Sequence, residues 1–350
     1  MKRICSLLLV IVALINIAGC NKTKKEKFTD YSFDYFDTVT IIVGYEESKD
    51  VFDSNCEKIK KLLEEYHQLY NIYNTYDGVN NLCAVNKTVD GEHVELTVDD
   101  KIIEMLQYAK EMHDVTNGNM NVAMGSVLSI WHNYRESGIN DPASATIPPL
   151  DQLMTAADHT DIDDLIIDSE NKTVYLADPE MKLDVGAVAK GYAVEKAAEW
   201  MAEQGINGYS LNVGGNIRIV GKRDDGNKWK VGIENPDTTD TELPYIEYLM
   251  LEDMSVVTSG NYQRFYEVDG KRYHHIIDPE TLMPGENFRS VTVVCKSSAL
   301  GDALSTALFN MNYEEGVALL EKFRDAEALW VFPDGEIKHS LRFKKYCVGN

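Results

Sequence analysis

The second half of the chain is a succession of strand-like segments, and their order constrains the fold more than any other feature of the sequence. Between residues 209 and 296, short runs rich in Val, Ile, Leu and Tyr are separated by turns that contain Gly, Asn or Pro, a pattern typical of strands joined by hairpins. Helical periodicity is unevenly placed, at residues 51–70, 99–113, 190–201 and from 299 onward. Because helices do not follow each strand, the sequence predicts an α+β fold with mixed, largely antiparallel sheets and inserted helices in a single compact domain.

The middle of the chain is less regular. It predicts an irregular stretch over residues 116–134, a polar insertion with prolines over residues 136–150, and strands at residues 165–168 and 173–176. With 44% hydrophobic residues the chain can bury one large core or two closely packed lobes. No linker rich in proline or serine and no internal repeat divides it.

The first 20 residues predict export from the cytoplasm. Lys2 and Arg3 give a positive start, and residues 6–15 form an apolar run that is too short to span a bilayer comfortably. Ala18 and Gly19 directly precede Cys20, which resembles a bacterial lipobox, where the cysteine is lipidated and the signal is removed before it. A plain cleaved signal and a retained anchor are the alternatives.

These features divide the chain into three parts. We expect a lipoprotein signal peptide at residues 1–19, the lipidated Cys20 with a short polar tether at residues 20–27, and the folded domain at residues 28–350. The protein would then be a membrane lipoprotein on the extracytoplasmic side, attached through its lipid anchor to the outer face of the cytoplasmic membrane or located in the periplasm.

The formal net charge is −23, and removal of Lys2 and Arg3 with the signal makes it more negative. This charge excludes nucleic acids and anionic lipid surfaces as partners of the folded domain. The cysteines of that domain have neither C-x-x-C spacing nor a zinc pattern, so we expect buried or spare thiols, with one disulfide left open. These cysteines are Cys56, Cys83, Cys295 and Cys347.

Residues 183–201, LDVGAVAKGYAVEKAAEWM, combine the parts of a phosphate site. A short apolar strand is expected to end at Asp184, two glycines bracket Lys190, and an amphipathic helix begins there. Backbone N–H groups in a glycine-rich turn and a helix N-terminus favour an anion, and the lysine adds a point charge suited to a pyrophosphate. The spacing matches neither G-x-x-x-x-G-K-[ST] nor G-x-G-x-x-G, so an ordinary tight strand-to-helix turn is the alternative.

Two other stretches have notable residues within or at the end of strands. In residues 211–217, LNVGGNI, the paired glycines predict a β-bulge or a place where another group packs against bare backbone. In residues 256–285, His275 and Asp278 lie near a strand end. A histidine beside an acid is a plausible proton acceptor, and a satisfied polar residue is the alternative.

Residues 297–309, SSALGDALSTALF, predict a helix capped by Ser297 or Ser298. Asp302 and Thr306 are four residues apart and share one face, opposite an apolar stripe. A carboxylate and a hydroxyl are oxygen ligands of the kind that Mg²⁺ takes. A plain polar helix face is the alternative.

Taken together, and in this order behind a lipobox, these stretches resemble the ApbE family of flavin transferases, the FAD:protein FMN transferases. The motifs that carry the resemblance are D-x-G-A-x-A-K-G-Y-A-V, N-x-G-G-N, T-S-G-x-Y-x-R with H-I-x-D-P-x-T, and G-D-A-L-S-T-A-L. The resemblance covers nearly the whole mature chain. It implies an ApbE-like fold and a Mg²⁺-dependent enzyme that takes FAD as its substrate, transfers the FMN half onto a Ser or Thr hydroxyl of a target protein, and releases AMP.

The same resemblance implies roles for residues in these motifs. Asp184 and Lys190 would bind the flavin nucleotide, which makes the pyrophosphate of FAD the expected anion. The carbonyl of Ala187, with Asp302 and Thr306, would hold the metal.

His275 matches the family histidine proposed to deprotonate the incoming hydroxyl. Further positions that match the family's flavin and nucleotide site are Phe36, Tyr76, Asn119, Met120, Asn121 and Trp131. The chain departs from the family pattern near the expected pocket, where Phe36 and Asp37 replace M-G, Asn121 begins the segment that replaces D-P-T, and Glu195 replaces an aspartate.

Two other functions stay open at this point. In the first, water replaces the protein hydroxyl, so that FAD is hydrolysed to FMN and AMP. In the second, the chain is a lipid-tethered protein that binds a flavin or another solute without catalysis. The resemblance implies extracytoplasmic redox-complex subunits with a short Ser/Thr flavinylation motif as acceptors, and because this chain contains no such motif, self-modification is not expected.

Overall fold

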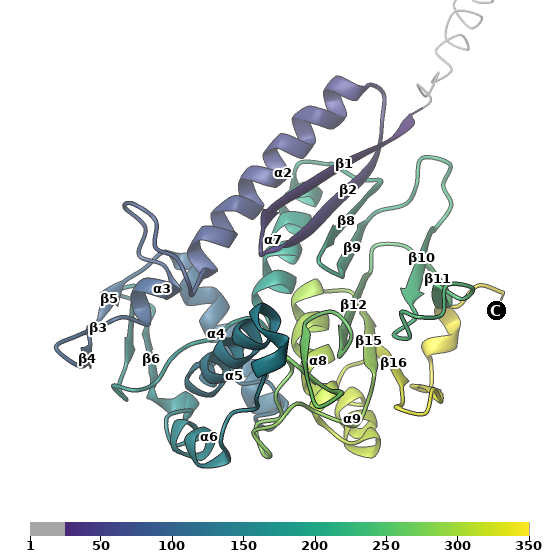
Figure 1. Ribbon diagram of the computed structural model, residues 1–350. Helices are drawn as coiled ribbons and strands as arrows, with labels where there is room; N and C mark the ends of the chain where they lie inside the picture. The colour runs from purple at the N-terminus through teal and green to yellow at the C-terminus, as the bar shows by residue number, and fades with distance from the viewer. Residues whose placement is uncertain (1–24, 350) are drawn as a thin grey trace, which may run out of the picture.

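The computed structural model describes residues 25–349. The predicted signal peptide, Cys20 and most of the tether therefore lie outside the described residues. The molecule is built around a large central sheet, with long helices on one face and smaller elements at its edges (Figure 1).

The central sheet has eight strands in the order β1-β2-β8-β9-β12-β15-β16-β17, and every neighbouring pair is antiparallel. Its alternating apolar residues face the helices on one side, as the period-2 pattern requires. The strands are β1 (Glu26–Tyr35), β2 (Thr38–Glu46), β8 (Tyr209–Val213), β9 (Asn216–Val220), β12 (Ser255–Gly260), β15 (Ser290–Cys295), β16 (Glu327–Val331) and β17 (Ile337–His339).

Three helices cover the inner face of this sheet: α2 (Lys49–Tyr70), α7 (Ala189–Glu203) and α8 (Ser298–Asn310). In α2 the apolar residues recur at helical spacing, so that Phe52 and Ile59 are fully buried. Helix α8 is buried on nearly all sides, because α7 packs against the face that carries Asp302. The core between the sheet and these helices therefore ends directly at the predicted metal residues.

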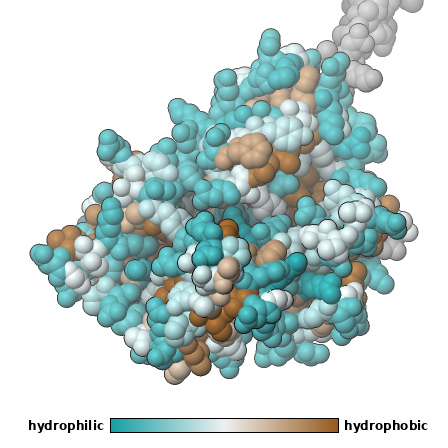
Figure 2. Space-filling model, in the orientation of Figure 1, coloured by the Kyte–Doolittle hydropathy of each residue, from teal (hydrophilic) through white to brown (hydrophobic). Residues whose placement is uncertain are grey.

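The outer face of the sheet is covered in part by the hairpin of β10 (Trp229–Glu234) and β11 (Tyr245–Leu251). The half formed by β1 and β2 is less covered. Tyr31, Phe33 and Val39 are exposed there, and Figure 2 shows apolar side chains gathered over these two strands.

Smaller elements complete the molecule. The remaining helices are α3 (Leu82–Val85), α4 (Asp100–Val115), α5 (Gly125–Asn140), α6 (Leu150–Ala157), α9 (Tyr313–Leu320) and the short 3₁₀ helices η1 (Pro142–Ser144), η2 (Ile162–Asp164) and η3 (Phe343–Tyr346). The remaining strands are β3 (Thr88–Val89) paired with β4 (Glu92–His93), β5 (Leu96–Thr97) and β6 (Leu165–Asp168) on either side of β7 (Thr173–Leu176), and β13 (Phe265–Val268) paired with β14 (Lys271–His274).

The predicted α+β class is confirmed, and the helices expected at residues 51–70, 99–113 and 299 onward are α2, α4 and α8. Ser297 caps α8, with its hydroxyl accepting from the Leu300 N–H. The strands expected at residues 165–168 and 173–176 are β6 and β7.

The prediction of an irregular stretch over residues 116–134 is wrong in its second half, because α5 begins at Gly125. No side chain caps this helix, and its first residue is a glycine, so the usual local signals are missing. The Gly125 N–H donates to the Lys182 carbonyl at 2.9 Å, and a Cβ at this position would lie 2.4 Å from that oxygen. A contact with a distant segment therefore positions the start of α5.

The predicted strand before Asp184 is also wrong. Residues 183–185 are irregular, and beside them is only an isolated bridge between Met124 and Lys182. Leu183 and Val185 are buried in the core. Their apolar character reflects this burial and not strand pairing.

The paired glycines do not form a β-bulge. Gly214 and Gly215 are the two turn residues of the β8–β9 hairpin, with φ of 56° and 90°, the combination that a tight hairpin turn requires. The other part of the prediction, close packing against bare backbone, is confirmed, since a Cβ at Gly214 would lie 2.5 Å from the Thr38 hydroxyl.

Candidate active site

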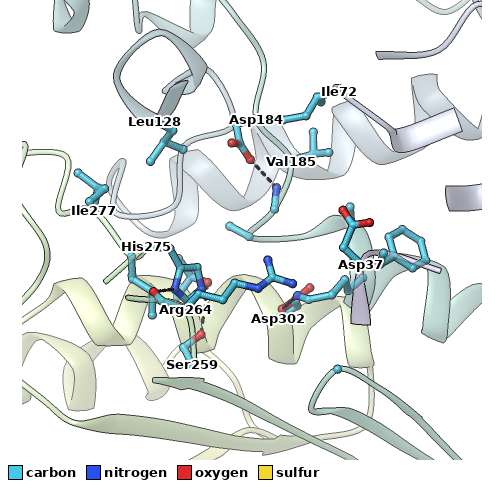
Figure 3. A pocket seen from close by; sticks show the side chains of 18 of the residues that line it. Asp37, Ile72, Leu128, Asp184, Val185, Ser259, Arg264, His275, Ile277 and Asp302 are labelled. Carbon is cyan, nitrogen blue, oxygen red and sulfur yellow. Dashed lines mark hydrogen bonds and ion pairs between the residues drawn. The ribbon is translucent and has the colours of Figure 1, made fainter. Parts of the chain in front are cut away.

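A cavity of about 450 Å³ opens where the turn between β1 and β2, the starts of α5 and α7, the end of β12 and the inner face of α8 meet. Figure 3 shows side chains from these distant segments pointing into one space. The predicted site residues that line it are Phe36, Asn119, Met120, Asn121, Asp184, Ala187, Lys190, His275, Asp302 and Thr306, and Trp131 lines it as well.

Asp184 shapes the turn that precedes α7. Its Oδ1 accepts the N–H of Gly186 at 2.9 Å, the contact drawn in Figure 3, and its own N–H donates to the Val122 carbonyl at 2.8 Å. Burial raises the pKa of the Asp184 carboxyl, while the nearby cations Arg135 and Arg264 act in the opposite direction. Asp184 therefore holds the glycine-rich turn with its carboxylate at the cavity wall.

Asp302 joins α8 to the start of α7. Its Oδ2 accepts the N–H of Gly191 at 2.7 Å, and its Oδ1 lies 3.6 Å from the ammonium of Lys190. The Asp302 residue is only 4% exposed, so these contacts compensate for the loss of water around its charge. The two helices approach this closely because residue 191 is a glycine, where a Cβ would lie 2.4 Å from both the Asp302 Cβ and the Ser298 carbonyl.

The oxygen donors around Asp302 fit a hard divalent cation. Gly191 is in the first turn of α7, where N–H groups have no carbonyl partner within the helix, and its N–H donates to Asp302. Ala187, in the turn just before α7, lines the same cavity. The Thr306 hydroxyl lies 3.5 Å from that of Ser259, so a carboxylate, a carbonyl and a hydroxyl line the same cavity, the oxygen set that Mg²⁺ prefers.

His275 lines the cavity beside Arg264 (Figure 3). Its Nδ1 is 3.3 Å from the Arg264 carbonyl, and its backbone N–H donates to the same oxygen at 3.1 Å. A carbonyl can only accept, so Nδ1 carries the proton and Nε2 is left with its lone pair. Burial and the nearby cations, Arg264 first among them, lower the pKa of His275 to about 3, which keeps the ring neutral at pH 7.

The cavity is far less acidic than the rest of the protein, because the three carboxylates that line it, Asp37, Asp184 and Asp302, are matched by three cations. Lys190, Arg135 and Arg264 all line it, whereas the chain as a whole carries a formal charge of −23. A cluster of cations in a concave, partly dry site attracts an anion more strongly than the net charge would suggest.

The segment Asn119 to Asn121 is fixed by its own polar groups. The Asn121 amide donates to the Thr160 carbonyl at 2.9 Å and its oxygen accepts from the Ala123 N–H at 2.8 Å. Met120 is almost completely buried, and the Asn119 amide donates to the Thr116 carbonyl at 3.1 Å. These contacts give the cavity wall a defined shape.

Tyr76 is the one predicted site residue that does not line the cavity. Its hydroxyl lies 3.2 Å from the His67 ring and from the Asn71 amide, and both of those residues do line it. The tyrosine that lines the cavity in this part of the chain is Tyr73, three residues before Tyr76.

Several lining residues were not among the predicted site residues. Arg264 is the last residue of the T-S-G-x-Y-x-R motif, but the motif alone assigns it no role. Arg135 and His132 lie on α5, in and just beyond the stretch predicted as irregular, so no helical periodicity pointed to them. His67 lies in the last turn of α2, a position that gives no signal of its own in the sequence.

Other features of the described residues bear on the remaining expectations. Cys56, Cys83, Cys295 and Cys347 are free and buried, as expected for structural thiols. Within residues 25–349 no three His, Cys, Asp or Glu side chains cluster as a metal site. No helix in that range is long and apolar enough to cross a membrane.

Comparison with known proteins identifies the family. The model of the ApbE family matches residues 34–330. A Vibrio cholerae protein named FAD:protein FMN transferase is 30% identical over 318 residues, which is 90% of this chain and 90% of the relative. A Klebsiella pneumoniae protein of the same name is 30% identical over 283 residues, covering 81% of this chain and 83% of the relative.

Solved structures agree with this relationship. An ApbE protein from Thermotoga maritima superposes with a TM-score of 0.79 at 26% identity, covering 92% of this chain and 99% of that protein. The flavin transferase ApbE from Vibrio cholerae superposes with a TM-score of 0.75, also at 26% identity and with the same coverage. The chain, with its four ordered motifs meeting in one cavity, belongs to the ApbE family.

Proposed function

We propose that this protein transfers the FMN half of FAD onto a Ser or Thr hydroxyl of a target protein and releases AMP. The observation that carries the proposal is the meeting of three kinds of group in one cavity: cations, a set of oxygen ligands, and a neutral histidine. Cations and oxygen ligands suit a bound pyrophosphate with its metal, and the histidine suits removal of a proton from an attacking hydroxyl. The relatives named FAD:protein FMN transferase support the same reaction.

The pyrophosphate of FAD would lie against the start of α7. Lys190 and the positive end of the helix dipole would supply positive charge there, since the N–H groups of Ala189 and Gly191 already donate to the Val185 carbonyl and to Asp302. The glycine-rich turn brings backbone close to the ligand. Arg264 also lines the cavity and adds a second cation. These groups would hold the FMN phosphorus in one position for in-line attack.

Asp302, Thr306 and the Ala187 carbonyl would hold Mg²⁺. When bound, the ion would supply positive charge to the pyrophosphate oxygens. Lys190 now lies 3.6 Å from Asp302, so these two residues would separate as Lys190 turns to the phosphate.

His275 would accept the proton of the acceptor hydroxyl at Nε2. The acceptor oxygen then forms a bond to the FMN phosphorus, the bond between that phosphorus and the bridging oxygen breaks, and AMP leaves with the bridging oxygen. Burial is the main cause of the lowered pKa of His275 in the free protein, and nearby cations, Arg264 and Lys190 among them, add to it. The phosphates of FAD would neutralise these cations. We therefore expect substrate binding to make His275 a stronger base.

The cellular setting is part of the proposal. The lipobox supports attachment through Cys20 on the extracytoplasmic side of the membrane, where the acceptors would be subunits of redox complexes with a Ser/Thr flavinylation motif. Lipid attachment and the acceptors rest on the sequence resemblance alone.

The test uses the mature protein, FAD, Mg²⁺ and a purified acceptor fragment with a Ser/Thr flavinylation motif. We expect a fluorescent flavin band at the size of the acceptor in a denaturing gel. The matched control is the same fragment with its acceptor hydroxyl residue replaced by Ala, which should stay dark. Free FMN with a dark acceptor would support hydrolysis instead, and bound FAD without any product would support a binding protein.

A further inference from the structure

The turn between β1 and β2 has the backbone of a tight hairpin turn but unusual residues at its centre. Phe36 and Asp37 are its two central residues, since Tyr35 pairs with Thr38, and their φ angles are 53° and 50°. Residues other than glycine rarely adopt this left-handed conformation, and two in succession need support from the surrounding structure. Both residues line the cavity.

His67, in the last turn of α2, supplies that support. Its Nδ1 accepts the N–H of Phe36 at 3.0 Å, and its ring meets the Phe36 ring edge-on with centroids 5.5 Å apart. Because an N–H donates to it, Nδ1 must be unprotonated, and in the neutral ring the proton is then on Nε2. That nitrogen lies 3.2 Å from the Tyr76 hydroxyl, to which it donates.

Hydrogen bonds connect His67, through Tyr76, to a second wall of the cavity. The Asn71 amide donates to the Tyr76 hydroxyl at 3.2 Å, and the Asn71 oxygen accepts the N–H of Tyr73 at 2.9 Å. Tyr73 lines the cavity, as His67 itself does. His67 therefore connects two walls of the cavity, the turn that carries Phe36 and Asp37 and the segment that carries Tyr73.

We propose that neutral His67 is a positioning residue for FAD, which holds the Phe36–Asp37 turn and, through Tyr76, the Tyr73 wall in the arrangement that the flavin nucleotide binds. The inference rests on the proposed function, because FAD is the ligand.

The proposal makes FAD binding sensitive to acid. A proton on Nδ1 would face the Phe36 N–H, so the hydrogen bond would be lost. Burial lowers the pKa of His67, whereas the carboxylates of Asp37 on the turn and Glu64 on α2 act in the opposite direction. The neutral form therefore prevails at pH 7, and FAD affinity falls as the pH drops through the lowered pKa of His67, below the ordinary 6.5 or so.

The experiment compares three variants with the parent protein. His67→Phe keeps an aromatic ring but removes the acceptor for the Phe36 N–H. His67→Asn places an amide oxygen close to the position of Nδ1 and cannot be protonated. His113→Phe is the matched control, since His113 is also in the last turn of a helix, α4, but does not line the cavity.

FAD affinity is measured by titration calorimetry from pH 7.5 down to pH 5, together with the melting temperature and the transfer rate at saturating FAD. We expect His67→Phe to raise the dissociation constant about tenfold at pH 7.5, as for one lost hydrogen bond, with the saturated rate within about threefold. His67→Asn should bind nearly as the parent does at pH 7.5 and lose less affinity toward pH 5. His113→Phe should follow the parent throughout.

Two results would overturn the proposal. One is parental FAD affinity in His67→Phe. The other is equal weakening in His67→Phe and His67→Asn with the same pH dependence as the parent, which would make His67 a packing residue only. A parent protein that binds no FAD at all would instead contradict the proposed function, so the two failures are distinguishable.

Discussion

At the residue scale, the candidate site depends on contacts such as that between Asp302 on α8 and the Gly191 N–H on α7. Asp302 and Thr306 could be found because their spacing of four places both on one helical face. The contact of Asp302 with Lys190 and Gly191 could not be found in this way, because it joins two helices that are far apart in the chain. Tyr76 shows the same limit, since its neighbour Tyr73, and not Tyr76, faces the cavity.

Replacing Asp302 tests the metal site at this scale. Asp302→Asn keeps an oxygen that can accept the Gly191 N–H but removes the charge, so it should fold and bind divalent cations at least tenfold more weakly. Mn²⁺ binding, followed by electron paramagnetic resonance, measures this with or without FAD. Glu203→Gln, on the exposed end of α7, is the control. Equal Mn²⁺ binding in Asp302→Asn and the parent would contradict the assignment.

Replacing His275 separates chemistry from binding. His275→Ala should bind FAD as the parent does, because no phosphate contact is expected of this ring. Its single-turnover transfer should fall on the order of 10²- to 10⁴-fold, as for a lost general base. If FAD affinity and melting temperature fall together while the rate at saturation is unchanged, the histidine is structural.

The pH dependence of activity, measured in His67→Asn so that residue 67 does not titrate, gives a second test of His275. Only the neutral ring accepts a proton, so activity is lost as pH falls through its pKa. In the free protein that pKa is lowered to about 3, and kcat/KM, which reports the free enzyme, should therefore hold to low pH. Bound FAD should raise the pKa of His275. The fall of kcat at low pH should therefore occur at a higher pH than the fall of kcat/KM. The reverse order would contradict this account.

At the element scale, periodicity predicts long helices well and contact-dependent elements poorly. Helices α2, α4 and α8 could be predicted because each has an apolar stripe and a side chain that caps its N-terminus. Helix α5 has no such cap and begins with Gly125 against the Lys182 carbonyl. Arg135 and His132 lie on this helix and line the cavity. Because the helix itself was not predicted, these two site residues could not be predicted from the sequence either.

The crossing of α7 and α8 depends on a single glycine. Gly191→Ala would place a Cβ 2.4 Å from the Asp302 Cβ and the Ser298 carbonyl, so the helices must separate. We expect a loss of about 1–3 kcal/mol in the free energy of unfolding and weaker Mn²⁺ binding, because Asp302 moves. Denaturant unfolding measures the first effect, with Glu203→Ala on the same helix as the control. An unchanged free energy of unfolding would show that the crossing tolerates a side chain.

At the scale of the whole molecule, an acidic body surrounds a cavity in which three cations match three carboxylates. We propose that lipidated Cys20 tethers this body to the membrane. The fold class could be predicted because it depends on the order of strands and helices, which the sequence pattern preserves. The cavity could not, because it is formed by segments from residue 36 to residue 310 that only the tertiary structure brings together.

Attachment to the membrane is tested through Cys20. In cells, the parent should fractionate with membranes, and Cys20→Ala should either be released or persist as an unprocessed precursor. Cys5→Ala, within the predicted signal, is the control and should behave as the parent. Unchanged processing and membrane attachment of Cys20→Ala would remove the lipoprotein assignment.

The central claim, that FMN passes from FAD to a protein hydroxyl, is tested most directly by the stoichiometry of a single reaction. The mature protein is mixed with FAD, Mg²⁺ and an acceptor in excess, and the AMP released is compared with the acceptor that gains one FMN by intact mass. The account predicts equal amounts of AMP and flavinylated acceptor at every time point and no accumulation of free FMN. AMP that appears in step with free FMN, while the acceptor mass stays unchanged, would contradict it.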